Sequence, residues 1–436
     1  MTDYNKELMS FLDKSPTDFH AISSIKKKLV ASGYSELAES EKWELTEGGK
    51  YFVTRNDSSI IAFRVPRFNF TGFMISAAHS DSPAFKVKEN PEIVENGYVK
   101  LNVEGYGGML MAPWLDRPLS VAGRIIVKNG NKYEVRLVNV DRDLLLIPNV
   151  AIHMNRDANK NQSWNAQVDM LPILGSADET KGTFMGIVAE AAEVNEDEII
   201  SHDLFVYARD KGKVWGGSDE YISAPHLDDL QCVYGCLEGF LGANNSSSVP
   251  VLAVFDNEET GSLTKQGADS TLLEDVLKRI SLSCSKDEEG YYRAVSSSFM
   301  VSADNAHALH PNHPEKADPV NRPAINKGIV IKFNAAQHYT TDAVSCAVYR
   351  DLCESNDIPV QVFTNRSDSR GGSTLGNVSN AHVSLNTVDI GLAQLAMHSC
   401  YETAGAKDTK HLIDAMTIFY SKTFRTDKAG LFELAD

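Results

Sequence analysis

The sequence lacks the features that mark membrane-spanning and secreted proteins. Its 436 residues contain no apolar run of about 18 residues, the length that a membrane-spanning helix requires. The N-terminal segment MTDYNKELMSFLDKSPTDFH has no basic start followed by an apolar core, so no secretory signal is expected. The six cysteines include no CxxC pair; we expect reduced core thiols, with a disulfide or a metal site as the alternative. These absences predict a cytoplasmic protein without a membrane partner.

Several catalytic and binding signatures are also missing. No G-x-S-x-G elbow occurs, which argues against a serine hydrolase of that type. No Walker-type loop and no G-x-G-x-x-G fingerprint occur, so nucleotide binding is unsupported. Lys and Arg number 42 against 59 Asp and Glu, which gives a formal net charge of -17. Such an acidic surface repels phosphate backbones, so nucleic acid is not an expected partner.

The apolar residues follow the periods of both helices and strands. With 42% hydrophobic residues, the chain can build a core, and its length suggests two domains or one large domain with an insertion. Helical spacing is typical of segments 18–33, 227–241 and 342–355. Buried strands are predicted at 51–53, 60–65, 71–79, 249–256, 299–303, 329–333 and 360–363.

The order of these elements predicts an α/β fold. Strands that alternate with helices indicate a mixed, mostly parallel sheet flanked by helices. Between about 90 and 220 the chain is β-rich, with one helix-like piece at 185–194. We therefore expect a main domain formed by residues 1–89 and 221–436, and an inserted β-rich domain at 90–220.

Polar clusters stand mostly where predicted strands end, which is where open α/β sheets bind ligands. Each cluster alone also fits an ordinary role, such as a polar turn, a core histidine or an acidic helix cap. The five clusters are His79-Ser80-Asp81, Asp228-Asp229, Asp256-Asn257-Glu258-Glu259, Asp304-Asn305-Ala306-His307 and Met397-His398.

Taken together, the clusters supply the ligand types that zinc accepts, namely His, Asp and Glu. The adjacent Glu258 and Glu259 repel each other at a strand end unless a positive ion neutralises them. One of them can bind a metal while its neighbour acts as a general base on water. Two metal ions roughly 3.5–4 Å apart also need one bridging carboxylate.

Longer motifs surround these clusters in a characteristic order. In chain order they are Ala78-His79-Ser80-Asp81-Ser82-Pro83, Leu227-Asp228-Asp229-Leu230, Asp256-Asn257-Glu258-Glu259-Thr260-Gly261-Ser262, Asp304-Asn305-Ala306-His307, Gly372-Ser373-Thr374-Leu375-Gly376 and Met397-His398-Ser399. This set resembles the aspartyl aminopeptidases, a family of dinuclear zinc aminopeptidases. The resemblance extends over nearly the whole chain.

The resemblance implies a zinc-exopeptidase fold and a metalloaminopeptidase that removes the N-terminal residue of peptides. It implies His79 and Asp304 as ligands of one zinc ion. Glu259 and His398 are implied as ligands of a second zinc ion, and Asp228 as the bridge between the two. Cobalt or manganese is expected to be able to replace zinc.

Further roles follow from the same resemblance. Glu258 is implied as the general base that takes a proton from the attacking water, and Asp81 as the residue that orients the histidine of the first zinc. His307 and Lys332 match positions near the substrate side chain. The inserted domain is implied to be a lid and dimerisation domain in a homododecamer built from dimers. There His153 would reach a neighbour's active site, with an ordinary interface histidine as the alternative.

Two residues differ from the family pattern in a way that affects the expected substrate preference. His338 and His226 stand where the family usually has arginine. A pocket for Asp or Glu side chains needs fixed positive charge, and histidine is mostly neutral at pH 7. We therefore expect removal of N-terminal Asp or Glu, with neutral or basic residues as the alternative.

Two other functional classes remain open at this point. One is a related two-metal amidohydrolase or deacylase. The other is a non-catalytic assembly scaffold, against which the presence of every implied ligand and of Glu258 argues.

Overall fold

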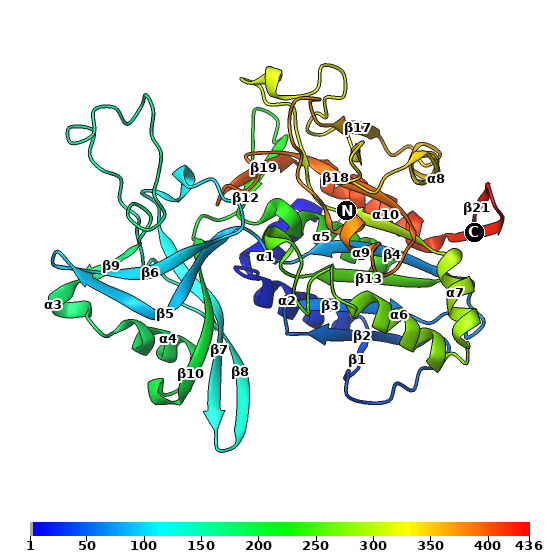
Figure 1. Cartoon of the computed structure of the whole chain (residues 1–436), viewed down its shortest axis with the longest axis horizontal. Coiled ribbons are helices and arrows are strands. Elements are labelled where there is room, and N and C mark those ends of the chain that lie inside the picture. Colours follow the sequence, from blue (N-terminus) through cyan, green and yellow to red (C-terminus); the bar gives the residue numbers. More distant parts are fainter. Residues whose placement is uncertain (1–2) are drawn as a thin grey trace.

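The computed structural model describes residues 3–436 and contains two main sheets, which stand side by side in Figure 1. The larger is a 13-stranded mixed sheet. Its main path runs β1 (Ser35–Glu36), β2 (Lys50–Arg55), β3 (Ser59–Arg64), β13 (Val249–Phe255), β4 (Phe73–His79), β14 (Phe299–Ala303), β18 (Asn386–Leu395), β19 (Glu402–Gly405), β12 (Tyr221–Ala224) and β11 (Lys213–Trp215). Beside β18 lie β15 (Ala306–His307) and β16 (Ile329–Phe333), and β16 also pairs with β17 (Val360–Thr364).

The central strands β13, β4, β14 and β18 run parallel. Every residue of β4 and of β13 is buried, which is the pattern of parallel strands covered on both faces. The register places Phe255, the last residue of β13, beside His79, the last residue of β4. The carboxyl ends of these strands therefore meet at one edge of the sheet.

Helices cover both faces of this sheet and form two separate hydrophobic cores. One face packs on α1 (Tyr4–Asp13), α2 (Asp18–Ala31), α5 (Leu227–Gly242), α8 (Ala343–Glu354) and α10 (Asp408–Ser421). The other packs on α6 (Leu272–Ser283), α7 (Glu288–Ser296) and α9 (Leu375–Ser379). In β3, Ile60 and Ala62 face the first core while Ile61 faces the second, as the alternation of side chains along a strand requires.

The predicted helices and strands of this sheet are confirmed, with ends shifted by a few residues. The helix expected at 18–33 is α2, which buries Ile22, Ile25 and Leu29 on one face. Gly33 follows it with a φ of 82°, the left-handed conformation that commonly ends a helix. The long central strand β18 is a finding that no sequence pattern had indicated.

The second sheet is antiparallel and has six strands. Its order is β8 (Lys132–Asn139), β7 (Leu119–Asn129), β10 (Ile199–Ala208), β5 (Ala84–Glu95), β6 (Tyr98–Tyr106) and β9 (Ile173–Ser176). The short α3 (Ala177–Thr180) and α4 (Phe184–Ala192) accompany it, and Phe184 and Val188 of α4 enter its core. The inserted domain predicted at 90–220 stays a proposal. The strands of this sheet extend from Ala84 to Ala208, and β11 already belongs to the large sheet.

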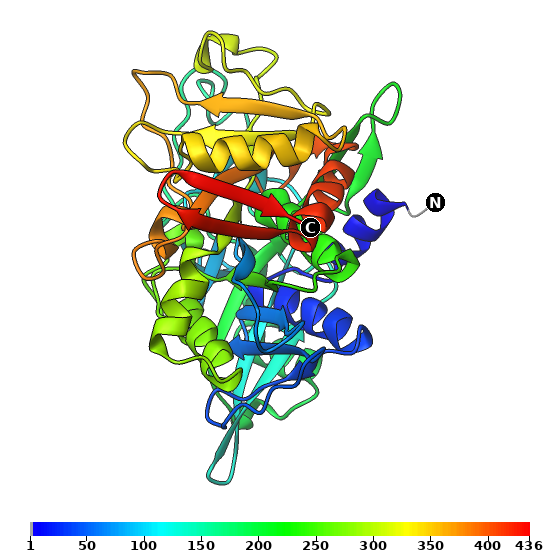
Figure 2. The same cartoon turned by 90° about the vertical axis from the view of Figure 1, so that its right-hand side faces the viewer.

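The chain ends in a hairpin of β20 (Thr423–Lys428) and β21 (Leu431–Ala435), at the end of the molecule opposite the inserted sheet (Figure 1) and facing the viewer in Figure 2. Phe424 of this hairpin packs against Phe299 of β14 with ring centroids 5.3 Å apart. All six cysteines are buried and unpaired, as predicted. Of the helices described, none combines the length and the apolar character that crossing a bilayer requires.

Candidate metal centre

The predicted ligands lie together at the edge of the large sheet where the parallel strands end. His79 ends β4, and Glu258 and Glu259 occupy the 3-10 turn Glu258–Thr260 that follows β13. Asp304 comes directly after β14, and His398 follows β18. The start of α5 adds Asp228 from the side, where it is buried with only 3% of its surface exposed. Six residues spread over the chain thus meet in one place.

Asp228 lies between the two histidines. Its Oδ1 atom is 3.7 Å from His79 Nε2, and its Oδ2 atom is 3.6 Å from His398 Nε2. Glu259 Oε2 lies 3.3 Å from the same His398 nitrogen. Each carboxylate oxygen of Asp228 therefore faces a different imidazole, which is the arrangement that a ligand bridging two metal ions needs.

Backbone carbonyl groups fix both imidazole rings. His79 Nδ1 lies 3.0 Å from the carbonyl oxygen of Asp81, and His398 Nδ1 lies 2.6 Å from that of Gly108. A carbonyl oxygen can only accept, so each Nδ1 carries a proton, and in the neutral form of the ring Nε2 then keeps a free lone pair. A histidine held in this way is prepared to bind a metal through Nε2.

Unsatisfied carboxylate oxygens support a cation at this place. Among the described residues, Asp228 Oδ1, Asp229 Oδ1 and Glu259 Oε1 are buried without any hydrogen-bond partner. Buried polar atoms normally have a partner, and three such oxygens in one cluster need positive charge. The possible ligand atoms of His79, Asp228, Asp229 and Asp304 lie within 4.8 Å of one another. The donor set of imidazole and carboxylate groups fits zinc.

The protonation behaviour of the cluster leads to the same conclusion. Burial and the nearby carboxylates of Asp304, Asp81 and Asp228 raise the pKa of Glu258 to about 8. Burial, followed by the charge of Asp228, also raises the pKa of Glu259 well above its ordinary value. Without a cation these carboxyl groups hold protons, because ionising all of them in a buried site would cost too much. A bound metal removes that cost.

Asp81 connects the first histidine with the glutamate turn. Besides its carbonyl contact, its Oδ1 lies 3.4 Å from His79 Nδ1. Its two carboxylate oxygens also accept hydrogen bonds from the backbone N–H groups of Glu258, at 3.1 Å, and Glu259, at 3.2 Å. The Tyr106 hydroxyl of β6 donates a further bond of 2.6 Å to Asp81. Asp81 therefore positions both the imidazole and the turn, and the inserted sheet holds Asp81.

Glu402 holds two other predicted ligands, Asp228 and His398, through similar hydrogen bonds. It is buried, and its two oxygens accept hydrogen bonds from the backbone N–H groups of Asp228, at 2.9 Å, and His398, at 2.8 Å. No sequence pattern assigned this role to Glu402, or the role of Tyr106 to that residue. Both residues act through hydrogen bonds to groups far away in the chain, which a linear pattern does not reveal.

A cavity of about 290 Å³ opens above the cluster. His307 and Lys332 line it together with the predicted metal ligands and Glu258, so the structure brings these residues together. The Lys332 ammonium is buried, lies 3.5 Å from Asp304 Oδ2 and donates to the carbonyl oxygen of Asn305 at 3.0 Å. Lys332 therefore offers positive charge at the wall of the cavity.

Three other histidines singled out in the sequence lie outside this cavity. His153 is exposed on the segment between β8 and β9 and does not line the cavity of its own chain. His338 is exposed in a neighbouring hollow, whose lining also includes Arg366 and Arg370. His226 lines a separate cavity, which it shares with Asp81, and does not line the cavity above the cluster.

Comparison with known proteins identifies the family of the chain. Residues 11–420 match the family model described as aminopeptidase I zinc metalloprotease (M18). A probable M18 family aminopeptidase 2 of Clostridium novyi is 48% identical over 426 residues, which cover 96% of this chain and 98% of that relative. A protein of the same description from Pseudomonas aeruginosa is 40% identical over 428 residues, or 97% of this chain and 99% of that relative.

Solved structures share the fold over almost the whole chain. A cryo-EM structure of an Ape4 and Nbr1 complex matches with a TM-score of 0.92 and 33% identity, covering 95% of this chain and 85% of that one. The mApe1 dodecamer of Saccharomyces cerevisiae matches with a TM-score of 0.84 and 27% identity, covering 96% of both chains. On these matches and on the buried histidine and carboxylate cluster, the chain belongs to the M18 family of zinc metalloaminopeptidases.

Proposed function

We propose that this aminopeptidase works with two zinc ions per subunit and removes single N-terminal residues from peptides. The observation that carries the proposal is the position of Asp228, whose two oxygens face the Nε2 atoms of two different histidines. A single metal ion would need only one of these two pairs of an Asp228 oxygen and a histidine nitrogen. Cobalt or manganese can take the place of zinc, because the same imidazole and carboxylate ligands accept them.

The residues that would hold the two ions divide into two groups around the shared carboxylate. His79 and Asp304 would hold the first ion with Asp228. Glu259 and His398 would hold the second with the other oxygen of Asp228. Glu402 and Asp81 would keep these ligands in place through their hydrogen bonds to the backbone and to the His79 ring.

When bound, the metal ions would polarise the peptide carbonyl group and lower the pKa of the attacking water. Glu258 would accept the proton of that water and deliver it to the leaving amine. Glu258 lines the same cavity as the proposed metal ligands, which supports its role in taking the proton and returning it. The substrate's free α-amino group would lie on the side of Glu259 and His398, which accounts for cleavage at the N-terminus only.

We propose N-terminal Asp or Glu as the preferred residue. Among the described residues that line the cavity, Lys332 is the one with a permanent positive charge, and His307 lies beside it. Arg366 and Arg370 add positive charge in the hollow next to the cavity, where His338 also lies. The alternative is a preference for neutral or basic residues, because Asp304 already neutralises part of the charge of Lys332.

We further propose that the subunits assemble as a homododecamer from dimers, with His153 completing the site of a neighbour. The similar mApe1 structure is described as a dodecamer. The exposed position of His153, away from the cavity of its own chain, supports a role in another subunit. Peptides would then be the partners and the cytoplasm the working compartment, without nucleic acid or membrane contacts.

The test is hydrolysis of aminoacyl amides and N-acyl amino acids by the purified, zinc-loaded protein, with and without a chelator. We expect chelator-sensitive release of N-terminal Asp and Glu. Chelator-sensitive release of neutral or basic residues would support the metal-dependent mechanism and contradict the proposed preference for Asp or Glu. Cleavage of the N-acyl amino acids alone would mean a deacylase, and no cleavage at all by metal-loaded protein would mean a non-catalytic scaffold.

A further inference from the structure

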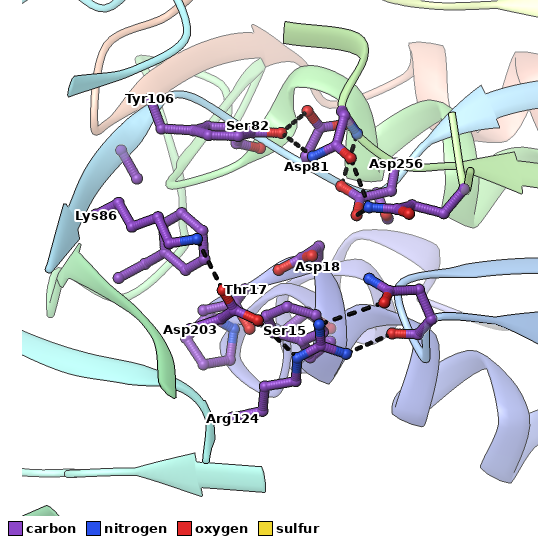
Figure 3. Close-up of a pocket in the computed structure, with 18 of the residues that line it drawn as sticks. Ser15, Thr17, Asp18, Asp81, Ser82, Lys86, Tyr106, Arg124, Asp203 and Asp256 are labelled. Atoms are coloured by element: carbon purple, nitrogen blue, oxygen red, sulfur yellow. Dashed lines mark hydrogen bonds and ion pairs between the residues drawn. The ribbon is translucent and has the colours of Figure 1, made fainter. Parts of the chain in front are cut away.

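A second cavity, of about 320 Å³, lies between the inserted sheet and the main domain. Figure 3 shows its lining side chains, which come from the start of α2, from the strand ends near Asp81 and Asp256, and from the inserted sheet. Asp81 and Tyr106 form the wall that it shares with the metal centre's surroundings. The proposed peptidase reaction makes no use of this space.

Asp18, the first residue of α2, points its carboxylate into this cavity (Figure 3). Only 9% of Asp18 is exposed, yet no side chain among residues 3–436 donates a hydrogen bond to it or forms an ion pair with it. Burial raises its pKa well above the ordinary value, and the carboxylates of Asp256 and Asp81 raise it further, against smaller effects of the Phe19 N–H and of the Arg124 guanidinium. An ionised Asp18 is therefore costly, and the charge of Arg124 offsets only part of that cost without forming an ion pair with it.

The two cations of the inserted sheet that line the cavity are already engaged. Lys86 Nζ lies 2.7 Å from Asp203 Oδ1, and Arg124 Nε lies 2.9 Å from Asp203 Oδ2. Arg124 also donates to the carbonyl oxygen of Asn56 at 2.7 Å. Asp203 pairs with both cations, although its single negative charge balances only one of them, and Lys265, the remaining lysine of the lining, is exposed to solvent. The four carboxylates of the lining still outnumber its three cations.

His226 does not form an ion pair that would balance the negative charge of Asp18 either. Its Nδ1 atom lies 3.3 Å from the carbonyl oxygen of Ser15 and is directed to the backbone. The remaining wall includes the aromatic rings of Tyr106 and Phe205, whose centroids lie 5.6 Å apart. A buried carboxylate beside aromatic rings is a suitable environment for an organic cation.

We propose that this cavity is a binding site for a small organic cation with a guanidinium or primary ammonium group, and that Asp18 is its counter-ion. The charged group would donate hydrogen bonds to the Asp18 carboxylate, and its hydrocarbon part would contact the aromatic wall. The volume admits a molecule of several heavy atoms but no folded partner. This site is independent of the proposed peptidase mechanism and does not depend on its being correct.

The test is isothermal titration calorimetry of the assembled, full-length protein with methylguanidinium chloride and ethylammonium chloride, against sodium chloride at equal ionic strength. We expect saturable binding of at least one organic cation, with one site per subunit. Asp18→Asn should weaken it by about tenfold or more, because the bond to an ionised acceptor is lost. His226→Arg should weaken the binding as well, because the new side chain brings its own guanidinium group into the cavity.

Asp197→Asn is the matched control, because Asp197 is an exposed aspartate far from the cavity lining. Its binding should equal that of the unmodified protein. The proposal is overturned if neither probe binds saturably, or if Asp18→Asn and His226→Arg bind as tightly as the control. If Asp18→Asn alone fails to fold or assemble, His226→Arg decides the outcome.

Discussion

The hydroxyl of Tyr106, on the inserted sheet, donates a 2.6 Å hydrogen bond to Asp81 in the main domain. The same hydroxyl accepts a hydrogen bond from Asn257 Nδ2 at 2.9 Å. One tyrosine thereby connects the insertion to the residue that positions both the first histidine and the glutamate turn. The insertion therefore contributes directly to the hydrogen bonds around the candidate metal centre.

Tyr106→Phe should reduce kcat by about tenfold while KM and zinc content change little, because outer hydrogen-bond partners of metal ligands have effects of this size. Steady-state kinetics and metal analysis on the purified variant check this. Tyr98→Phe is the matched control, since Tyr98 lies on the same strand and is 52% exposed. Equal kcat values for the two variants would show that Tyr106 does not position Asp81.

Glu258→Gln should lower kcat by about 10²–10⁴-fold, the usual contribution of a general base, with zinc content unchanged. Glu259→Gln should instead lose zinc, because Glu259 stands 3.3 Å from His398 Nε2. Metal analysis and kinetics of both variants separate the two roles. Loss of zinc from Glu258→Gln with retention in Glu259→Gln would mean that the two glutamates have exchanged roles.

Removal of the metal should destabilise the protein. The buried oxygens of Asp228, Asp229 and Glu259 then lose the cation that satisfies them. At free zinc a hundredfold above Kd, the lost stabilisation is about 2.7 kcal/mol per site in the free energy of unfolding. Thermal unfolding with and without a chelator measures it, and adding zinc back should restore Tm. An unchanged Tm would mean that the cluster does not hold a metal.

His153→Ala should lower kcat/KM by about tenfold or more without changing zinc content, because a misplaced or missing positioning group has effects of this order. Dilution to isolated subunits should lower the activity of the unmodified protein in the same way. Kinetics alongside analytical ultracentrifugation provide the measurement. If His153→Ala keeps full activity in the assembled state, the shared site is wrong.

Asp18→Asn should stabilise the protein at alkaline pH. The pKa of Asp18 is higher in the folded state than in the unfolded chain, because burial and the Asp256 carboxylate disfavour its ionisation. Its contribution to stability is therefore present at acid pH and is lost as the pH rises through the folded-state pKa. The Tm of the variant should exceed that of the unmodified protein at pH 9, and the difference should shrink towards pH 5. A constant difference would mean that Asp18 does not titrate between these values.

The sequence predicted the strands that carry the ligands because they are uninterrupted apolar runs, such as Val249–Phe255. It missed β18 because the buried positions of that strand include Asp389 and Gln394, which hide the apolar pattern. Asp389 can be buried because Thr340 and Thr374 donate hydrogen bonds to it. Such partners become visible only in three dimensions.

Likewise, only a part of the candidate site could be predicted from the sequence. The motifs around His79 and Glu258 could be recognised because the residues that form them are neighbours in the chain. The tasks of Tyr106 and Glu402 depend on contacts with Asp81 and Asp228 across the fold. Asp18 likewise shows nothing unusual in sequence, because an acidic residue in the first turn of a helix is common.

The position of His398 has a consequence for the newly made chain. It is the last of the predicted ligands, it follows the last central strand, and its ring is held by Gly108 of the inserted domain. A ribosome-bound chain carries His79 long before it carries His398, so it cannot assemble the second half of the centre until residue 398 has been made. Peptidase activity should therefore arise only after the segments that carry His79, Gly108 and His398 have all been made and have folded together.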